Sequence, residues 1–373
     1  MHVHLRQPGR EDKETIESGS RAAARGGFTS VCPMANTDPV IDTRGMVEFV
    51  LEEARRSSLV RVYPVGAVTK GQRGEELAEL GELYESGCVA FSDDGRPIQN
   101  SMVMRRALEY AGMYGLPIIV HAQDEFLFSD GVMHEGYVST RLGLRGIPSE
   151  CESIMIARDI ELMRLTKGRV HFAHISTSRS VELIQAAKAG RLAVTCETAP
   201  HYFALSDEAL SSFDANFKMN PPLRTDSDVA SVKRALKEGT IDCIATDHAP
   251  HTVQEKDVEL DAASFGVTGL ETSLALALTF LVQPGLLTPT ELVMRMSVAP
   301  SRILGLGKGT LAVGSDADVT VIDPKKKWTV RPEEFESKGR NSPFAGWELQ
   351  GLAEMTIVGG KIVMRDGKIL GGE

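Results

Sequence analysis

Eight short apolar runs, each followed by a stretch with helical spacing, constrain the fold of this 373-residue chain more than any other feature. Most of the runs are continuously apolar rather than alternating, which is typical of strands buried on both faces of a parallel sheet. They cover residues 1–4, 29–36, 61–68, 88–94, 117–123, 169–176, 192–200 and 241–250. Eight β–α units predict an α/β fold of the (β/α)8, or TIM-barrel, type. A doubly wound open sheet is the alternative, but no GxGxxG or GKS/GKT loop supports a nucleotide-binding fold.

The spacing between the runs also divides the chain. Several predicted helices end just before a glycine, as at Gly26 and Gly239, which is typical of helix C-termini. The helices are expected over residues 11–25, 43–57, 75–86, 102–114, 150–167, 178–189, 226–238 and 270–281. The pattern changes at the glycine-rich segment 305–309, after which residues 317–322 and 355–363 have the pattern of short strands. We therefore predict a hydrolase-type barrel over 1–304 and a small C-terminal β appendage over 305–373.

Composition excludes several classes of function. The chain has 41 Lys and Arg against 51 Asp and Glu, a net charge of −10, and its longest basic block is Lys325–Lys327, which argues against a nucleic-acid partner. The longest largely apolar run, Leu274–Val282, is far shorter than the ~20 residues that span a bilayer, which argues against a membrane protein. The sequence opens with polar residues instead of a secretory signal, and its five cysteines form no CxxC pair. Buried thiols in the reducing cytoplasm are therefore expected.

Histidines and carboxylates gather at the predicted strand ends. His2 and His4 are spaced i, i+2, so they point to the same face of a strand. The other polar residues at strand ends are Asn36, Asp93, Asp94, His121, His174 and Asp247. The C-terminal ends of barrel strands meet at one mouth, and imidazole and carboxylate suit Zn²⁺ and similar ions. The set exceeds what one tetrahedral ion needs, and a carboxylate can bridge two ions, so the sequence predicts a binuclear site. His171 falls on the opposite face of its strand and His134 in a predicted loop, and neither receives a role.

Short motifs along the whole chain carry a family resemblance. They are HVHLRQPG (2–9), MANTDP (34–39), FSDDGR (91–96), VHAQDE (120–125), AHISTSRS (173–180), KMNPPLR (218–224), ATDHAPH (245–251) and FGVTGLET (265–272). Together they resemble the dihydroorotases, in the longer bacterial type within the amidohydrolase superfamily. The segment VGSDADVTVID (313–323) resembles the small β domain of that superfamily. The HxH pair marks only the superfamily, whereas KMNPPLR and TDHAPH together are much more specific to dihydroorotase.

The resemblance implies an activity and a set of site residues. The activity is the zinc-dependent, reversible cyclisation of N-carbamoyl-L-aspartate to (S)-dihydroorotate in pyrimidine biosynthesis. Two zinc ions are implied, one held by His2, His4 and Asp247, the other by His121 and His174, with Asp94 bridging both. Asp247 is also expected to be the catalytic residue that moves the proton. The implied substrate contacts are His4, Arg6, Asn36, Asn220, His251, Phe265 and Gly266. Arg6 suits a substrate carboxylate; without the resemblance it is only a charge at the barrel mouth.

Two departures from the wider superfamily affect these expectations. Hydantoinases and allantoinases bridge their metals with a carboxylated lysine, but this chain has no lysine between Lys70 and Lys167. Asp94 is therefore expected to be the bridge, and Asp93, which points the other way on a strand, to make a loop hydrogen bond.

Family members also carry a further stretch before the HxH pair. We therefore expect strand one to be truncated and the β appendage to lack its N-terminal half.

Two rival functions remain open at this point. An allantoinase or hydantoinase shares the chemistry, but the missing lysine and KMNPPLR argue against it. A non-catalytic dihydroorotase-like partner of aspartate transcarbamoylase shares the fold, but such proteins lose metal ligands that are all present here. Beyond the small-molecule substrate, the resemblance implies pairing with a second copy or with aspartate transcarbamoylase.

Overall fold

The structure is a computed structural model that describes residues 1–370, and its centre is a closed ring of parallel strands. Within the described residues, one six-stranded sheet has the order β10-β9-β8-β5-β4-β3. Its strands are β3 (Val65–Gly66), β4 (Ala90–Phe91), β5 (Ile118–Val120), β8 (Val170–Phe172), β9 (Val194–Thr198) and β10 (Cys243–Ile244). β1 (Ser30–Val31) pairs with β2 (Arg61–Val62), which precedes β3 in the same extended run. Val3 closes the ring through parallel bridges to Pro33 and His248. The predicted (β/α)8 barrel is confirmed.

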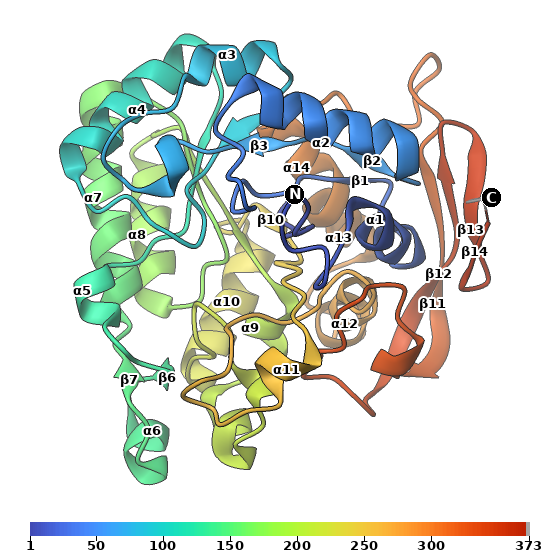
Figure 1. Ribbon diagram of the computed structural model, residues 1–373. Coiled ribbons are helices and arrows are strands. Elements are labelled where there is room, and N and C mark those ends of the chain that lie inside the picture. The colour runs from blue at the N-terminus through green and yellow to red at the C-terminus, as the bar shows by residue number, and fades with distance from the viewer. Residues whose placement is uncertain (371–373) are drawn as a thin grey trace.

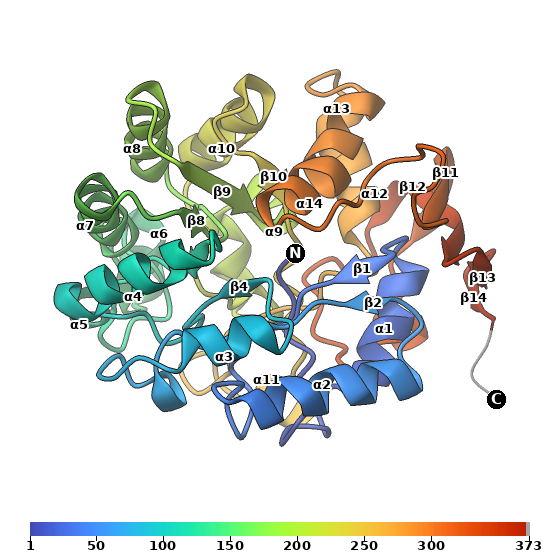
Figure 2. The same ribbon diagram turned by 90° about the horizontal axis from the view of Figure 1, so that it is seen from above.

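Helices surround this ring on the outside, with Met1 near its centre (Figure 2). They are α1 (Ile16–Arg25), α2 (Arg44–Ser57), α3 (Leu80–Glu85), α4 (Ser101–Met113), α7 (Glu150–Thr166), α8 (Ser178–Ala189), α10 (Asp226–Glu238), α12 (Ser273–Ala277), α13 (Pro289–Val293) and α14 (Ala299–Ile303). Most follow the predicted ranges, but α1 and α3 begin five residues late. For α1 the cause is local, because Thr15 caps the helix in a capping box with Ser18. π-helical turns, at Leu278–Val282 and Met294–Val298, extend α12 and α13.

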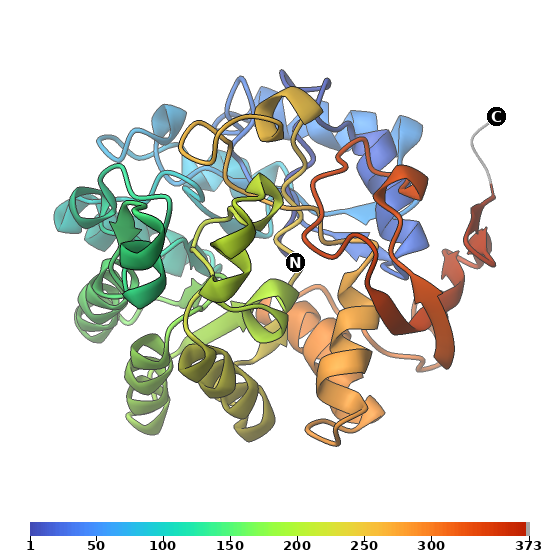
Figure 3. The same ribbon diagram turned by 90° about the horizontal axis from the view of Figure 1, so that it is seen from below.

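The C-terminal appendage is an antiparallel sheet on one side of the barrel (Figure 1). Its strands are β11 (Val319–Thr329), β12 (Glu348–Val358), β13 (Lys361–Arg365) and β14 (Lys368–Ile369), in that order. β12 packs on α1, where Thr356 Oγ1 donates to the Ala24 carbonyl at 2.7 Å. The connection from β11 to β12, which includes the 3-10 turn Pro332–Glu334, returns to the barrel beside the loops that follow β10 (Figure 3).

Several short elements follow the strand ends. After β5 come α5 (Glu125–Phe128), β6 (Met133–His134), α6 (Tyr137–Leu142) and β7 (Gly146–Ile147), which project from the barrel (Figure 1). After β9 come α9 (Pro200–Ala204) and the 3-10 turns Asp207–Ser212 and Ala215–Phe217; α11 (Val253–Lys256) follows β10, and the turn Lys70–Gln72 follows β3. The sequence prediction of a loop at His134 is wrong. This residue pairs with Ile147 in the β6–β7 sheet because the arm folds back on itself.

The cysteines lie in the interior of the protein. Within the described residues, all five cysteines are buried and unpaired, as expected. No helix in this part of the chain is both long and apolar enough to cross a membrane.

Candidate active site with a metal centre

The predicted metal ligands converge at the ends of the barrel strands. The six side chains are all buried: His2, His4, Asp94, His121, His174 and Asp247. His174 and Asp247 lie just beyond β8 and β10 and have positive φ angles of 34° and 46°. Such angles are uncommon outside glycine and often mark functional sites. The fold therefore brings together every side chain that the sequence placed in the metal centre.

Asp94 lies at the middle of this cluster, and each of its oxygens faces a different pair of histidines. Oδ2 is 3.6 Å from His2 Nε2 and 3.5 Å from His4 Nε2. Oδ1 is 3.6 Å from His121 Nδ1 and 3.5 Å from His174 Nε2. Donor atoms that share one tetrahedral zinc at 2.0–2.1 Å lie about 3.3–3.4 Å from one another. The spacing around both oxygens therefore fits a carboxylate that bridges two ions.

Asp247 completes the donor set on one side of Asp94. Its Oδ1 is 3.5 Å from His2 Nε2 and 3.3 Å from His4 Nε2. His2 Nε2 and Asp94 Oδ1 have no hydrogen-bond partner among the described residues, although both are buried. Buried polar atoms normally have hydrogen-bond partners, so two buried atoms without one, on residues of this cluster, fit metal ligands. The residues present therefore fit two ions.

Contacts within the cluster lower the pKa of its two carboxylates, Asp94 and Asp247. Burial opposes ionisation of Asp94, but the charge of His2 and the hydrogen bonds of His121 and His174 hold its pKa well below the ordinary value. Burial likewise opposes ionisation of Asp247, but its bond to His4 and the charge of His2 lower its pKa to about 2. Both carboxylates are therefore ionised near neutral pH, as metal ligands must be.

Glu197 orients His2 from the side away from Asp94. His2 Nδ1 donates to Glu197 Oε1 at 2.7 Å, which holds the ring with Nε2 toward Asp94 and Asp247. The second oxygen of Glu197 lies 3.3 Å from His171 Nε2, and both residues are buried. Sequence analysis missed Glu197, although it lies in the seventh predicted strand, which had been given no site residue.

Two asparagines support other histidines. His4 Nδ1 donates to Asn36 Oδ1 at 2.9 Å. Asn220 Nδ2 donates to Gln123 Oε1 at 2.8 Å and lies 3.3 Å from His121 Nε2. The structure therefore brings both predicted asparagines to the centre, where they contact histidines or their partners.

A second cluster surrounds Arg6. Its Nε donates to the Pro250 carbonyl at 3.2 Å, and its Nη2 lies 3.4 Å from His251 Nε2. His251 Nε2 donates to the Phe265 carbonyl at 2.8 Å. Burial lowers the pKa of Arg6 to about 10, and burial with the Arg6 charge lowers that of His251 to about 3. A charged guanidinium beside a neutral imidazole suits an anionic ligand group.

Gly266 fits tightly beside this cluster. Its φ is 123°, and a Cβ there would lie 2.7 Å from Ala249 Cβ and 3.2 Å from His251 Nε2. Only glycine fits without displacing its neighbours.

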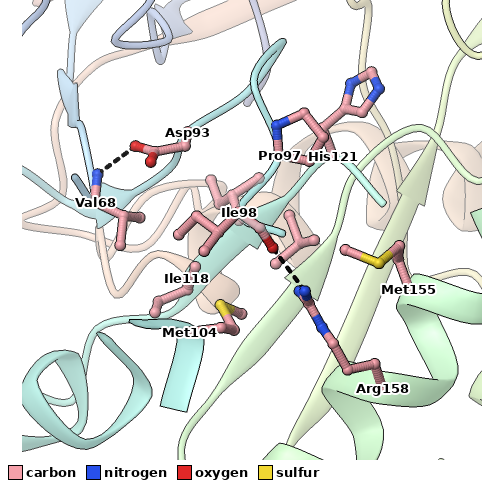
Figure 4. Close-up of a pocket in the computed structure, with 11 residues that line it drawn as sticks. Val68, Asp93, Pro97, Ile98, Met104, Ile118, His121, Met155 and Arg158 are labelled. Atoms are coloured by element: carbon pink, nitrogen blue, oxygen red, sulfur yellow. Dashed lines mark hydrogen bonds between the residues drawn. The ribbon is translucent and has the colours of Figure 1, made fainter. Parts of the chain in front are cut away.

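Asp93 points away from the metal ligands. Its Oδ1 accepts from the backbone N–H groups of Val68 and Thr69 at 2.8 and 3.1 Å, and its Oδ2 from the Thr69 hydroxyl. Figure 4 shows Asp93 directed at Val68. The His121 ring points away from a small cavity, about 20 Å³ in volume, which both Asp93 and His121 help to line. The neighbouring aspartates thus have different surroundings, and Asp93 makes the expected loop hydrogen bonds.

Comparison with known proteins places this site in a class. The barrel is similar to the L-hydantoinase (dihydropyrimidinase) from Arthrobacter aurescens, with a TM-score of 0.90 and 26% identity over 99% of this chain and 84% of that one. It is also similar to the D-hydantoinase from Thermus sp., with a TM-score of 0.83 and 25% identity over 100% and 84% of the chains. The barrel and its histidine–aspartate centre define a metal-dependent cyclic amidohydrolase.

Sequence comparison identifies the family within that class. The model of a family described as dihydro-orotase-like matches residues 1–180. The dihydroorotase of Pelotomaculum thermopropionicum is 56% identical over 366 residues, 98% of this chain and 86% of that protein. The dihydroorotase of Geobacter metallireducens is 56% identical over 365 residues, with the same coverage. The chain belongs to the dihydroorotase family.

Proposed function

We propose that this protein is a zinc-dependent dihydroorotase that interconverts N-carbamoyl-L-aspartate and (S)-dihydroorotate for pyrimidine biosynthesis. The observation that carries the proposal is Asp94, whose two oxygens each face a pair of histidines beside the Arg6–His251 cluster. The dihydroorotase relatives at 56% identity support the choice of substrate.

The proposed metal centre uses the six buried ligands. His2, His4 and Asp247 would hold one zinc, His121 and His174 the other, and Asp94 would bridge them. Bound zinc supplies a lowered pKa for water and polarisation of the substrate carbonyl. The complete set of ligands favours this enzyme over a non-catalytic homologue.

Asp247 is the residue we assign to proton transfer. In the hydrolytic direction water adds to the ring amide carbonyl of dihydroorotate, and the Asp247 carboxylate takes its proton. The carbon–nitrogen bond then breaks, and Asp247 returns the proton to the departing ring nitrogen. In the biosynthetic direction the same carboxylate takes the ureido proton as water leaves.

The substrate carboxylate is assigned to the Arg6 cluster. The Arg6 guanidinium supplies charge and two N–H groups, and His251 and the Phe265–Gly266 backbone form the adjacent wall. Asn36 contacts His4 and Asn220 contacts His121, so their amides are assigned to the ring edges of the substrate. Holding the ring at both ends keeps its amide carbonyl beside the reacting groups.

The domain bounds, the cellular compartment and the protein partners are further proposals. We propose 1–304 as the barrel domain and 305–373 as the β appendage, because the strand pattern changes from parallel to antiparallel between them. The buried, unpaired thiols support a cytoplasmic protein. Pairing with a second copy or with aspartate transcarbamoylase rests on the family resemblance and is tested by sedimentation of the protein alone and mixed with that enzyme.

Turnover of a substrate panel tests the proposed activity. The purified protein is loaded with zinc, its metal content is measured, and hydrolysis of dihydroorotate, hydantoin, dihydrouracil and allantoin is compared. We expect about two zinc ions per chain and kcat/KM highest for dihydroorotate by at least about 100-fold, since a site built around a carboxylate rejects rings that lack one. Zinc-loaded protein that prefers an uncharged ring, or turns over none of the four, refutes the assignment.

A further inference from the structure

We propose that Asn341, on the connection between β11 and β12, is a positioning residue of the substrate-carboxylate pocket. The proposal rests on the proposed function, because it takes His251 and Gly266 as walls of that pocket. It extends the active site to a segment far along the chain from every barrel strand.

The Asn341 side chain joins the two backbone segments that form the pocket wall. Its Nδ2 donates to the Ala249 carbonyl at 3.0 Å and to the Gly266 carbonyl at 3.1 Å. Its Oδ1 accepts from the His251 backbone N–H at 3.1 Å. The side chain is buried, and its backbone carbonyl accepts from Thr268 N at 2.9 Å. One amide thus fixes the distance between the segment that carries His251 and the segment that carries Gly266.

The connection itself is held against the barrel by a buried carboxylate. Glu14 Oε2 accepts from Ser337 Oγ at 2.5 Å, and Glu14 Oε1 accepts from Lys338 N at 3.2 Å. Gly339 lies so close that a Cβ there would be 2.7 Å from Pro250 Cβ and 2.8 Å from Asn341 Oδ1. The approach of this segment to the pocket is therefore specific, and it has no room for a side chain at residue 339.

A separate contact keeps the pocket loop attached when Asn341 is changed. The Gly266 carbonyl also accepts from Lys256 Nζ at 3.0 Å, and the same ammonium donates to the Ser264 carbonyl at 2.8 Å. Ala249 N donates to Val267 O at 2.8 Å across the same two segments. Loss of the Asn341 amide should therefore shift His251 and Gly266 without detaching the loop.

The metal ligands are not among the contacts of Asn341. A displacement of His251 and Gly266 weakens binding of the substrate carboxylate equally in the ground state and the transition state, so KM rises while kcat changes little. A general loss of folding would instead lower the amount of active enzyme and its metal content.

The experiment compares Asn341→Ala and Asn341→Asp with Lys338→Ala in the zinc-loaded full chain. Asp has nearly the same shape as Asn but cannot donate to the two carbonyls. Lys338 is an exposed neighbour whose ammonium contacts only the Glu11 carbonyl among the described residues, so it is the matched control. For both Asn341 variants we expect KM for dihydroorotate to rise by about tenfold, with kcat within about threefold and zinc content unchanged. The control should keep the wild-type KM.

Hydrogen exchange gives a readout that does not depend on turnover. The backbone amides of Ala249, His251 and residues 266–268 should exchange faster in the Asn341 variants than in the wild type or the control, and amides on the far side of the barrel should not change. If the wild type has no dihydroorotase activity, the proposed function fails while this measurement still decides the positioning role. Wild-type KM with unchanged exchange overturns the inference. So does loss of soluble protein or of zinc in both Asn341 variants, since Asn341 is then a residue of the fold alone.

Discussion

Removing the Glu197 carboxylate should weaken metal binding even though Glu197 is not expected to touch a metal. Its Oε1 accepts the Nδ1 proton of His2 at 2.7 Å, and this bond fixes the tautomer that presents Nε2 to Asp94 and Asp247. In Glu197→Ala the His2 ring loses the hydrogen bond at Nδ1 and can turn or protonate at Nε2. Glu197→Gln keeps an acceptor oxygen in place but loses the charge that raises the basicity of the ring.

The expected magnitude follows from the kind of contact. Loss of such a partner costs about 10–100-fold in metal affinity, or roughly 1.4–2.7 kcal/mol. We expect Glu197→Ala near the upper end of that range and Glu197→Gln near the lower end. Because Glu197 also faces the buried His171, the alanine variant leaves polar atoms without partners, which costs about 1–3 kcal/mol of folding stability.

Competition with a zinc chelator measures the affinity, and thermal unfolding of the metal-free proteins measures stability separately. Asp159→Asn is the control for Glu197→Gln, since Asp159 is an equally buried carboxylate whose partner is Arg158 rather than a histidine. The control should bind zinc as the wild type does. Wild-type affinity in both Glu197 variants would show that His2 needs no such support.

Three further predictions test the remaining groups. Asp94→Ala should lose most of its metal and nearly all turnover because both ions lose their shared ligand, whereas Asp93→Ala should keep its metal. Metal analysis of both variants tests this, and loss of metal in Asp93→Ala but not in Asp94→Ala would refute the assignment. Asp247→Asn should keep most of its metal but lower turnover by roughly 10²–10⁴-fold, the usual scale for general acid–base catalysis, and near-normal turnover would contradict the proton-transfer role. Burial raises the pKa of Glu271 from 4.5 to about 7 despite the nearby charge of Arg25, so its contribution to stability is complete below pH 4.5 and is lost as pH rises to about 7. Over that window Tm should fall more steeply in the wild type than in Glu271→Gln, and equal slopes would count against a raised pKa.

The sequence was sufficient to predict the barrel and the convergence of the proposed metal ligands, because both depend on local signals. Continuous apolar runs mark strands buried on two faces, and the residue at the end of each strand lies at the mouth whatever the loops do. His121, His174 and Asp247 could therefore be placed before the structure was known. α3 was predicted too long because Glu75–Glu79 have helical composition but precede the helix, and composition sets helix ends poorly.

The support around the ligands was not predictable in the same way. Glu197 lies on a predicted strand, but its partner His2 is 195 residues away, and no spacing rule pairs them. Asn341 is a single asparagine in an irregular segment, and its role depends on how closely Gly339 lets that segment approach Pro250. Such roles arise from tertiary packing, which local patterns do not record.

Barrel closure at Val3 links metal binding to the integrity of the ring. Strand one is joined to the segment after β10 by a bond from His4 N to the His248 carbonyl at 2.8 Å and one from Thr246 Oγ1 to the His2 carbonyl at 3.0 Å. In the proposed centre, an ion held by His2, His4 and Asp247 would be a cross-link between these same two segments, at opposite ends of the barrel sequence. A cross-link that closes so long a loop removes much entropy from the unfolded chain, so the ion would act on stability as a disulfide does. Removal of the ion by a chelator would then loosen the pairing of strand one with the His248 segment first, while the regular β4–β5–β8–β9 sheet keeps its pairing.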